Sequence, residues 1–370
     1  MSCDLACPFF GRFDQARHIA MNIKQVAKKA RVSTATVSRI INGSSAVRPK
    51  TAERVQRAIR ALNYYPNTHA RTLVSGRSRI LGLIISDIAN PFFPELVKGF
   101  EDVALQNNYE VILTNTNYDA IRMASCVQRM LERKAEGVAI MTSEMNSQLI
   151  GELARRGIPI VFLDVGTVRN RISNICVDYS QGIHEAVDHL CALGHRRIGF
   201  ISGPMALKSA RTRRSSFLEC LKQYDLAKED ALIVEGNHKI DGGELAMYRL
   251  LQLKKAPTAV LTSNDLTAFG ALRAIHHARL RVPDDVSIVG FDDIELSQFA
   301  QPPLTTIRLP RTELGRIAFE ALFKILRGDS QKGAEYRIES HLVVRSSTSA
   351  AHPLHVTDME DAAVKHGGSL

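Results

Sequence analysis

From residue 80 onward, short apolar runs alternate with segments of helical periodicity. Near-continuous runs of Val, Ile and Leu are typical of strands buried on both faces, and strand–helix alternation is typical of a parallel sheet. We therefore predict an α/β core over residues 79–346, with two doubly wound parallel-sheet subdomains, a cleft between them, and chain crossings near Val177 and Ile307. The predicted strands are ILGLIIS (80–86), EVILTN (110–115), GVAIMTS (137–143), IPIVFLD (158–164), RIGFISG (197–203), ALIVEG (231–236), AVLTSND (259–265) and SIVGFDD (287–293).

Residues 22–62 have a different pattern, which predicts a small all-α unit of three short helices. Asn22 can cap the first helix, Ser33 can cap a second helix over 34–41, and Pro49 suits the first turn of the third. The side chains predicted to face inward are Val26, Ala27, Ala30, Val37, Ile40, Ile41, Val55, Ile59 and Leu62.

The segments outside these two units lack regular periodicity. We predict that residues 1–20 form an extension without fixed structure and that Met21 is the natural start. Residues 66–78 are polar and predict a linker with one helical turn. Residues 347–370 are polar without heptads and predict a frayed tail. The predicted units are thus a head over 21–65, the linker over 66–78 and the core over 79–346.

The positive charge is concentrated in the first fifth of the chain. Residues 1–79 contain 15 Lys and Arg against 3 Asp and Glu, a net charge of +12. The remaining residues contain 33 basic and 35 acidic side chains, so their net charge is −2. Such asymmetry points to a nucleic acid or an anionic membrane surface as the partner of the head.

Several classes of protein are disfavoured by what the sequence lacks. No apolar run approaches the ~20 residues that span a bilayer, and the N-terminus does not resemble a signal peptide. The six cysteines are scattered and unpaired in spacing, which predicts reduced thiols in a cytoplasmic protein and no metal site. There is no GxSxG, GxxxxGK[ST] or HExxH motif, so we expect neither an enzyme nor a cofactor.

The stretch VAKKARVSTATVSRIING (26–43) predicts two short helices around a tight turn at Arg31-Val32, which is the spacing of a helix-turn-helix. Small residues open the second helix, and Arg39 is long enough to reach a guanine edge. An ordinary surface helix is the alternative from this pattern alone. The side chains able to bond phosphates are Ser33, Thr36, Ser38 and Asn42.

Polar side chains follow several predicted strands of the core. Ligands of open parallel sheets bind beyond the carboxyl ends of strands, so these side chains predict a binding cleft. Carboxylates, amides and an Arg can bond hydroxyls, while Phe packs the apolar face of a ring, which suits a polyol. Helix caps and core packing are the alternatives for the Asp and Phe residues. The candidates are Asn90, Phe92, Phe93, Asp164, Arg213, Asn264 and Asp292.

At this point the chain resembles a known family. The run from Ile23 to Leu73 closely resembles the DNA-binding head of the lac repressor (LacI/GalR) family, and the downstream motifs NPFFPELVKGFE, SND, GFDD and PPLTTI also match. The resemblance covers about residues 22–346. It implies a periplasmic-binding-protein-like core, a homodimer, a palindromic double-stranded operator and a small-molecule effector that controls operator affinity.

For the head, the resemblance implies roles for particular residues. Thr34, Ala35 and Arg39 fall where the family contacts base edges. The run PNTHARTL (66–73) resembles the hinge helix, in which Ala70 and Leu73 fall at minor-groove positions, and an apolar wedge there can bend DNA. Phosphate-contact positions are occupied by Ser33, Thr36, Asn42 and Asn67.

For the core, the resemblance places Asn90, Phe92, Arg213 and Asp292 at effector-contact positions, with Asp164 nearby. The chain departs from the family at three positions: Arg31 occupies the turn, Arg48 replaces a capping Ser, and His238 replaces an aromatic platform. We favour a sugar-responsive repressor that is released by its effector. A purine- or nucleoside-controlled repressor and a corepressor mechanism remain the alternatives.

Overall fold

The computed structural model describes residues 22–41, 47–64, 77–142, 147–164, 168–226 and 232–352. It contains two compact units, Met1–Ser78 and Arg79–Leu370, which are considered separately. The predicted extension over 1–20 lies outside the described residues, and so does most of the linker over 66–78.

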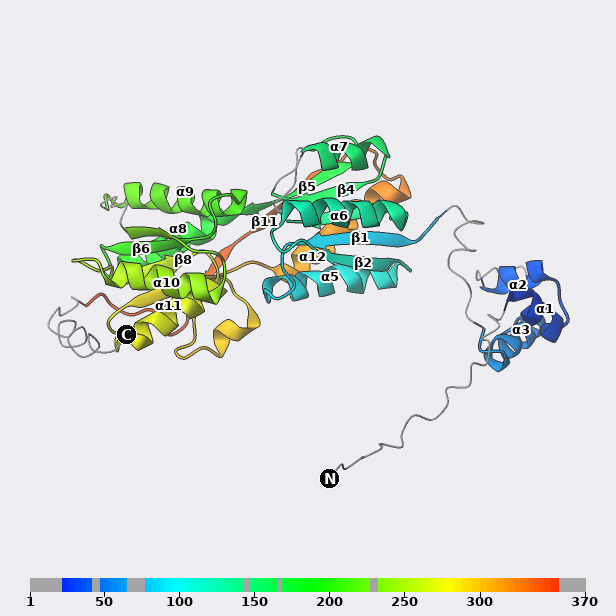
Figure 1. Ribbon diagram of the computed structural model, residues 1–370, viewed down its shortest axis with the longest axis horizontal. Helices are drawn as coiled ribbons and strands as arrows, with labels where there is room; N and C mark the ends of the chain where they lie inside the picture. The colour runs from blue at the N-terminus through cyan, green and yellow to red at the C-terminus, as the bar shows by residue number, and fades with distance from the viewer. Residues whose placement is uncertain are drawn as a thin grey trace, which may run out of the picture. The chain divides into compact units, whose positions relative to one another are not determined.

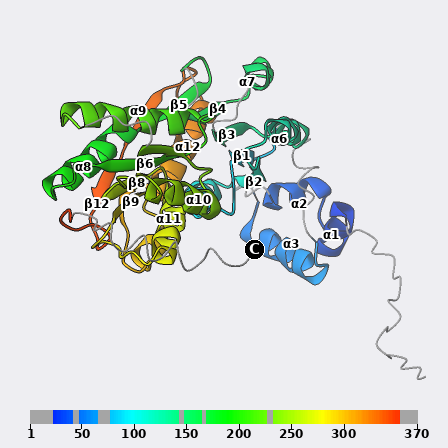
Figure 2. The same ribbon diagram turned by 60° about the vertical axis from the view of Figure 1, so that its left-hand side comes forward.

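The head contains the three predicted helices (Figures 1 and 2). These are α1 (Ile23–Ala30), α2 (Thr34–Ile41) and α3 (Pro49–Ala61). The side chain of Asn22 accepts a hydrogen bond from the Gln25 N–H, and that of Ser33 accepts one from the Thr36 N–H, so both predicted caps are present. The buried core of the head consists of Val26, Ala27, Ala30, Val37, Val55, Ala58 and Tyr64, with Ile40, Ile41, Ile59 and Leu62 partly buried against it.

Two positions of the head show the backbone consequences of its unusual residues. Arg48 precedes α3 without making a side-chain cap. Arg31 ends α1 in the left-handed conformation, with φ of 52°, and its side chain is exposed. A side chain with a Cβ is strained in this conformation by roughly 1–2 kcal/mol. Glycine is the usual residue at such a helix end.

We therefore expect Arg31→Gly to raise the free energy of unfolding of the head by roughly 1 kcal/mol. The measurement is native-state hydrogen exchange of the α1–α3 amides in the full chain. Arg31→Ala is the matched control, because it removes the same charge and keeps the Cβ. Equal slowing of exchange in both variants would show that charge repulsion, not backbone strain, is the cause.

The core contains two six-stranded sheets, in agreement with the predicted fold class (Figure 1). Their strand orders are β11-β5-β4-β3-β1-β2 in the first lobe and β12-β10-β9-β8-β6-β7 in the second. Among the strands of the described residues, every pair is parallel except β10–β12. The strands are β1 (Ile80–Ile85), β2 (Glu110–Asn115), β3 (Gly137–Met141), β4 (Ile160–Leu163), β5 (Ile172–Asp178), β6 (Ile198–Ser202), β7 (Ile233–Glu235), β8 (Ala259–Thr262), β9 (Ser287–Asp292), β10 (Thr305–Arg308), β11 (Glu335–Glu339) and β12 (His341–Val343).

Helices pack against both faces of each sheet (Figure 1). In the first lobe α5 pairs with α12, and a Cβ at Gly99 or Gly315 would collide with the backbone of the opposite helix, so this pair is closely packed. A short 3-10 helix, Glu295–Gln298, follows β9. The helices of the core are α5 (Phe92–Gln106), α6 (Ala120–Glu132), α7 (Ser147–Arg155), α8 (Tyr179–Ala192), α9 (Lys208–Gln223), α10 (Ile240–Leu251), α11 (Asp265–His277) and α12 (Arg311–Arg327).

The chain passes between the two sheets three times: after Asp178 into α8, between Arg308 and Arg311 into α12, and at Ser340 between β11 and β12. The crossing at Ser340 is not among those predicted. Its hydroxyl donates to the Asp178 carbonyl and accepts from the Gly182 N–H, which ties the third crossing to the first.

The predicted tail over 347–370 is wrong at its beginning. Ser347 is buried, and its hydroxyl accepts from the Thr305 N–H at 2.8 Å and donates to the Ile288 carbonyl at 2.6 Å. Further along, the Ala351 N–H donates to the Leu193 carbonyl. These residues extend the second sheet's hydrogen bonding without an apolar pattern, so sequence periodicity could not identify them. Among the described residues, no helix is long and apolar enough to cross a bilayer.

Candidate DNA-binding surface and effector site

The exposed face of α2 presents the residues predicted to contact bases. Thr34, Ala35 and Arg39 are all exposed, while Val37 turns toward the core of the head. Ser33 is engaged as the cap of α2, and its hydroxyl also lies 2.9 Å from that of Thr36. Thr36 and Ser38 are half-buried. Their contacts with DNA stay predictions, and Asn42, Asn67, Ala70 and Leu73 lie outside the described residues.

The surrounding surface of the head is strongly basic. Residues 22–64 contain ten Lys and Arg side chains in the described segments, all exposed, and Glu53 is the sole acidic residue there. Positive charge at this density favours a polyanion and supplies the part of DNA affinity that does not depend on sequence.

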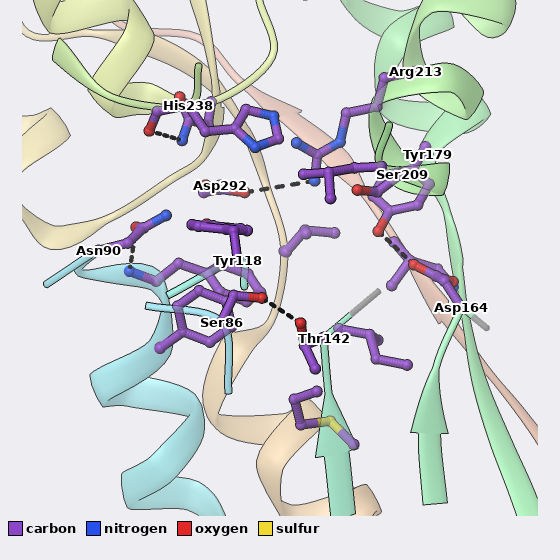
Figure 3. Close-up of a pocket in the computed structure, with 18 residues that line it drawn as sticks. Ser86, Asn90, Tyr118, Thr142, Asp164, Tyr179, Ser209, Arg213, His238 and Asp292 are labelled. Atoms are coloured by element: carbon purple, nitrogen blue, oxygen red, sulfur yellow. Dashed lines mark hydrogen bonds and ion pairs between the residues drawn. The ribbon is translucent and has the colours of Figure 1, made fainter. Parts of the chain in front are cut away.

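All seven predicted effector residues line one pocket of the core (Figure 3). Its walls come from the carboxyl ends of strands in both sheets, where open parallel sheets bind their ligands. The cavity volume is about 80 Å³, several times the ~10–15 Å³ that one water requires. The other polar or aromatic side chains of its lining, which were not predicted as contacts, are Ser86, Tyr118, Thr142, Tyr179, Ser209 and His238.

Arg213 and Asp292 form the charged part of the pocket. Arg213 projects from α9, and its Nη2 lies 3.9 Å from the Oδ1 of Asp292 at the end of β9. The guanidinium also donates to the Ser263 carbonyl and lies over the rings of Tyr179 and Phe291, at 4.7 and 4.1 Å from their centroids. Both partners of the ion pair are buried, so little solvent screens the interaction.

Burial shifts the pKa values of Asp292 and His238, which both face Arg213, in opposite directions. Burial raises the pKa of Asp292 to about 7, because loss of hydration outweighs the attraction of Arg213. Burial and the charge of Arg213 lower the pKa of His238 to about 3. His238 is therefore neutral at physiological pH, whereas Asp292 is divided between its charged and neutral forms.

Asp164 and Tyr179 form a second polar pair in the pocket. The Tyr179 hydroxyl donates to Asp164 at 2.5 Å, and the Val177 N–H donates to the other carboxylate oxygen at 2.8 Å. Burial raises the pKa of Asp164. Because both oxygens of Asp164 already accept one hydrogen bond, this pair has less capacity for a ligand than Asp292.

Two further predicted residues have structural roles at the pocket wall. The Oδ1 of Asn264 accepts from the backbone N–H and the hydroxyl of Thr267, so Asn264 caps α11, and its amide donates to the His238 carbonyl. The Oδ1 of Asn90 accepts from the Phe92 N–H at 3.0 Å. Phe92 and Phe93 pack edge to face with centroids 5.1 Å apart and present aromatic surface to the pocket.

Two residues that line the pocket each have a buried polar atom without a hydrogen-bond partner in the described part of the chain. These atoms are the Nε of Arg213 and the Nε2 of His238, and the hydroxyl of the neighbouring Ser263 is unpaired as well. A buried polar group without a partner costs roughly 1–3 kcal/mol. Figure 3 shows Arg213 and His238 converging beside Asp292. A polar ligand that bonded these atoms would remove that cost.

The backbone is strained around the same pocket. Asp164, His238 and Asp292 all have positive φ, of 60°, 62° and 109°. Such conformations cost of order 1–3 kcal/mol each and concentrate at functional sites. The φ of Asp292 departs furthest from the values that residues with a side chain usually adopt, since it lies beyond the left-handed helical region.

Comparison with known proteins identifies both units of the chain. A model described as bacterial regulatory proteins, lacI family, matches residues 22–67, and one described as a periplasmic binding protein-like domain matches residues 187–348. The ribose operon repressor of Haemophilus influenzae is 34% identical over 325 residues, covering 88% of this chain and 98% of the relative. Catabolite control protein A of Priestia megaterium is 32% identical, covering 89% and 99%. The transcriptional repressor PurR of Photorhabdus laumondii is 34% identical, covering 88% and 96%.

Solved structures show the same architecture. The lac repressor dimer bound to operator and the anti-inducer ONPF is 32% identical with a TM-score of 0.80, covering 89% of this chain and 99% of that one. A complex of the transcriptional regulator CelR with cellobiose is 28% identical with a TM-score of 0.66, covering 88% and 99%. These relatives are transcriptional regulators with a DNA-binding head and a ligand-binding core, and they are not enzymes. The chain belongs to the lacI family of bacterial transcriptional regulators.

Proposed function

We propose that this chain is a homodimeric repressor whose affinity for a palindromic operator is controlled by a small sugar in the pocket of the core. The exposed, basic face of α2 supports operator binding through Thr34, Ala35 and Arg39. The relative solved with operator is a dimer, and a two-fold dimer matches a palindromic site. Since such a regulator acts on the chromosome, we place it in the cytoplasm.

The observation that carries the sugar proposal is the buried Arg213–Asp292 pair in the pocket, together with an unpartnered polar atom on Arg213 and another on His238. Arg213 Nε–H requires an acceptor, His238 Nε2 can serve as donor or acceptor, and the Asp292 carboxylate requires a donor. A hydroxyl both donates and accepts, so adjacent hydroxyls of one sugar satisfy all three. Phe92 and Phe93 supply an apolar surface for the face of the ring.

A purine-controlled repressor is the second candidate, because several relatives are named as the repressor PurR. Other relatives point to sugars: one is a ribose operon repressor, and related structures contain bound ribose and cellobiose. The neutral, buried imidazole of His238 offers less stacking area than a larger aromatic ring, which favours the sugar.

The test is operator binding by the full chain, measured by fluorescence anisotropy on a palindromic duplex with a central CG step. D-ribose, D-galactose, cellobiose, adenine and hypoxanthine are titrated separately at fixed salt. We expect one sugar to weaken operator binding at least about tenfold, within the usual range of allosteric coupling. We expect Asp292→Ala to abolish that response while leaving operator affinity without sugar unchanged.

Other outcomes separate the alternatives. A response to a purine alone would replace the sugar with a purine effector. A ligand that tightened operator binding would indicate a corepressor mechanism. In sedimentation at micromolar concentration we expect the mass of two chains, and a mass near four chains would contradict the dimer.

The effector response is expected to depend on pH through Asp292. Its pKa of about 7 means that the carboxylate gains a proton as pH falls from 8 to 6, so that one oxygen becomes a donor and the charged acceptor, which binds a hydroxyl more strongly than a neutral one, is lost. The sugar's affinity should therefore fall about tenfold over that interval. The groups facing Asp292 are Arg213, Arg311 and Asp265, and His238 stays neutral throughout.

The measurement is the sugar's dissociation constant from isothermal titration calorimetry at pH 6, 7 and 8. Asp292→Asn is the control, because it has no proton to gain and should show a flat profile. An equally sloped profile in Asp292→Asn would assign the titration to another group.

A further inference from the structure

A single buried guanidinium connects the two lobes of the core beside the pocket. Arg311 is the first residue of α12, at the second chain crossing, and its side chain is only 9% exposed. Its Nε and Nη2 bind both carboxylate oxygens of Glu95 in the first turn of α5, at 2.9–3.1 Å. This is the bidentate geometry, in which a carboxylate orients an Arg side chain most strongly.

The remaining nitrogen of the same guanidinium binds the other lobe. Nη1 donates to the Asp292 carbonyl and, at 2.5 Å, to the Asp293 carbonyl, where β9 ends. The direct backbone bond at this point is weak, because the Leu309 N–H lies 3.5 Å from the Asp292 carbonyl. Arg311 therefore provides the main hydrogen bonds between the end of β9 and the start of α12.

The residue held by Arg311 is also the residue that faces the effector. Asp292 presents its carboxylate to the pocket and its carbonyl to Arg311, and its φ of 109° is a strained conformation that needs external support. On the other side, Glu95 lies in the same helical turn as the pocket residues Phe92 and Phe93. The hydrogen bonds from Glu95 through Arg311 to Asp292 thus connect two walls of the pocket that belong to different lobes.

We infer that Arg311, oriented by Glu95, is the positioning residue that transmits effector occupancy at Asp292 to the orientation of the first lobe. An effector that moves the Asp292 side chain also moves its backbone carbonyl, and this carbonyl is bonded to α12. The close packing of α12 on α5 at Gly99 and Gly315 passes that movement to the whole lobe. This inference rests on the proposed function for its effector, but the contact itself does not.

The first experiment needs no effector. Hydrogen exchange of the full chain compares wild type with Arg311→Met, which keeps the aliphatic stem and removes the guanidinium. We expect exchange at least about tenfold faster both in residues 290–297 and in the first turn of α5. Arg308→Met is the matched control, since Arg308 binds the Asp293 carboxylate at 2.6 Å within the second lobe and should affect only residues 290–297. Unchanged exchange at α5 in Arg311→Met would overturn the inference.

The second experiment measures coupling with the compound that responds in the anisotropy panel. In Arg311→Met the effector's influence on operator affinity should fall from at least tenfold to within about twofold. Glu95→Gln should lower the coupling while leaving effector affinity within about threefold, because Arg311 can still bind the Asp292 carbonyl. Coupling that stayed at the wild-type level in both variants would overturn the inference. A panel without any active compound would refute the proposed effectors and leave the exchange result decisive for Arg311.

Discussion

Replacing Arg213 with methionine is expected to lower effector affinity at least about 100-fold. Breaking a buried ion pair by removing one partner costs about 3–5 kcal/mol, because the other group either stays charged without compensation or has to be neutralised by a proton. Here the remaining partner is Asp292, whose pKa is already about 7 with Arg213 present. Without the guanidinium the pKa of Asp292 rises further, so Asp292 is neutralised by a proton at neutral pH. The effector then loses both the guanidinium donor and the charged acceptor, which is the stronger form.

The measurement is isothermal titration calorimetry with the compound that proves active, alongside urea unfolding. Arg211→Met is the matched control: Arg211 lies two residues earlier in α9, is exposed, and donates to the carbonyls of Met205 and Ala206, which do not line the pocket. We expect it to leave effector affinity within about threefold. If Arg213→Met lost stability but bound the effector as wild type does, Arg213 would be a structural residue that holds the Ser263 carbonyl and the rings of Tyr179 and Phe291.

The apolar runs predict eight strands, among them the edge strands β2 and β7, but they do not predict β5, β10, β11 or β12. β1, β3, β8 and β9 are buried along nearly their whole length, so their runs are continuously apolar. β5 contains Ser173 and Asn174, and β11 is an edge strand exposed at alternate residues, so neither has a continuous apolar run. Parallel pairing supplies their hydrogen bonds regardless of side chain, and local sequence contains no signal of that.

The residues of the candidate site can be predicted where they follow a predicted strand, and cannot where they follow a strand that the sequence does not indicate. A polar residue at the end of an apolar run can be predicted to line the pocket. Ser86 and Thr142 meet this criterion as well, since each lies just beyond such a run. Both line the pocket, and their hydroxyls lie 2.8 Å apart. Tyr179 follows β5, a strand that was not predicted, so no local pattern could place it against Asp164. Asn264 caps α11, whereas helix capping is the alternative that the pattern gives for the Asp residues only.

The contacts that support the pocket could not be predicted, because they join residues far apart in the sequence. Glu95 and Arg311 are 216 residues apart, and neither lies in a motif that indicates the other. Arg311 also donates to the carbonyl of Asp292, the residue with a φ of 109°, and this carbonyl otherwise accepts only the long bond from Leu309. The pocket therefore consists of strand-end residues that the alternation pattern can indicate and of supports that only the fold brings together.

The second large effect concerns the head. Arg39→Met is expected to weaken operator binding roughly 10- to 100-fold, because a two-pronged Arg–guanine contact contributes about 1–3 kcal/mol of discrimination between bases. Arg39 is exposed on the same face of α2 as Thr34 and Ala35, and it makes no hydrogen bond or ion pair with the described residues of the head that would be lost with it. The loss should therefore appear in specific binding and not in folding of the head.

The salt dependence of binding separates a base contact from a phosphate contact. Each neutralised phosphate contributes about −0.9 to the slope of log affinity against log salt. Removing a base-contacting Arg should leave this slope unchanged and should leave affinity for an unrelated duplex within about threefold. Arg57→Met, on α3 and exposed, is the control for loss of one positive charge. If Arg39→Met instead weakened binding to all duplexes equally and lowered the slope by about one unit, Arg39 would contact phosphate, and sequence recognition would depend on Thr34 and Ala35.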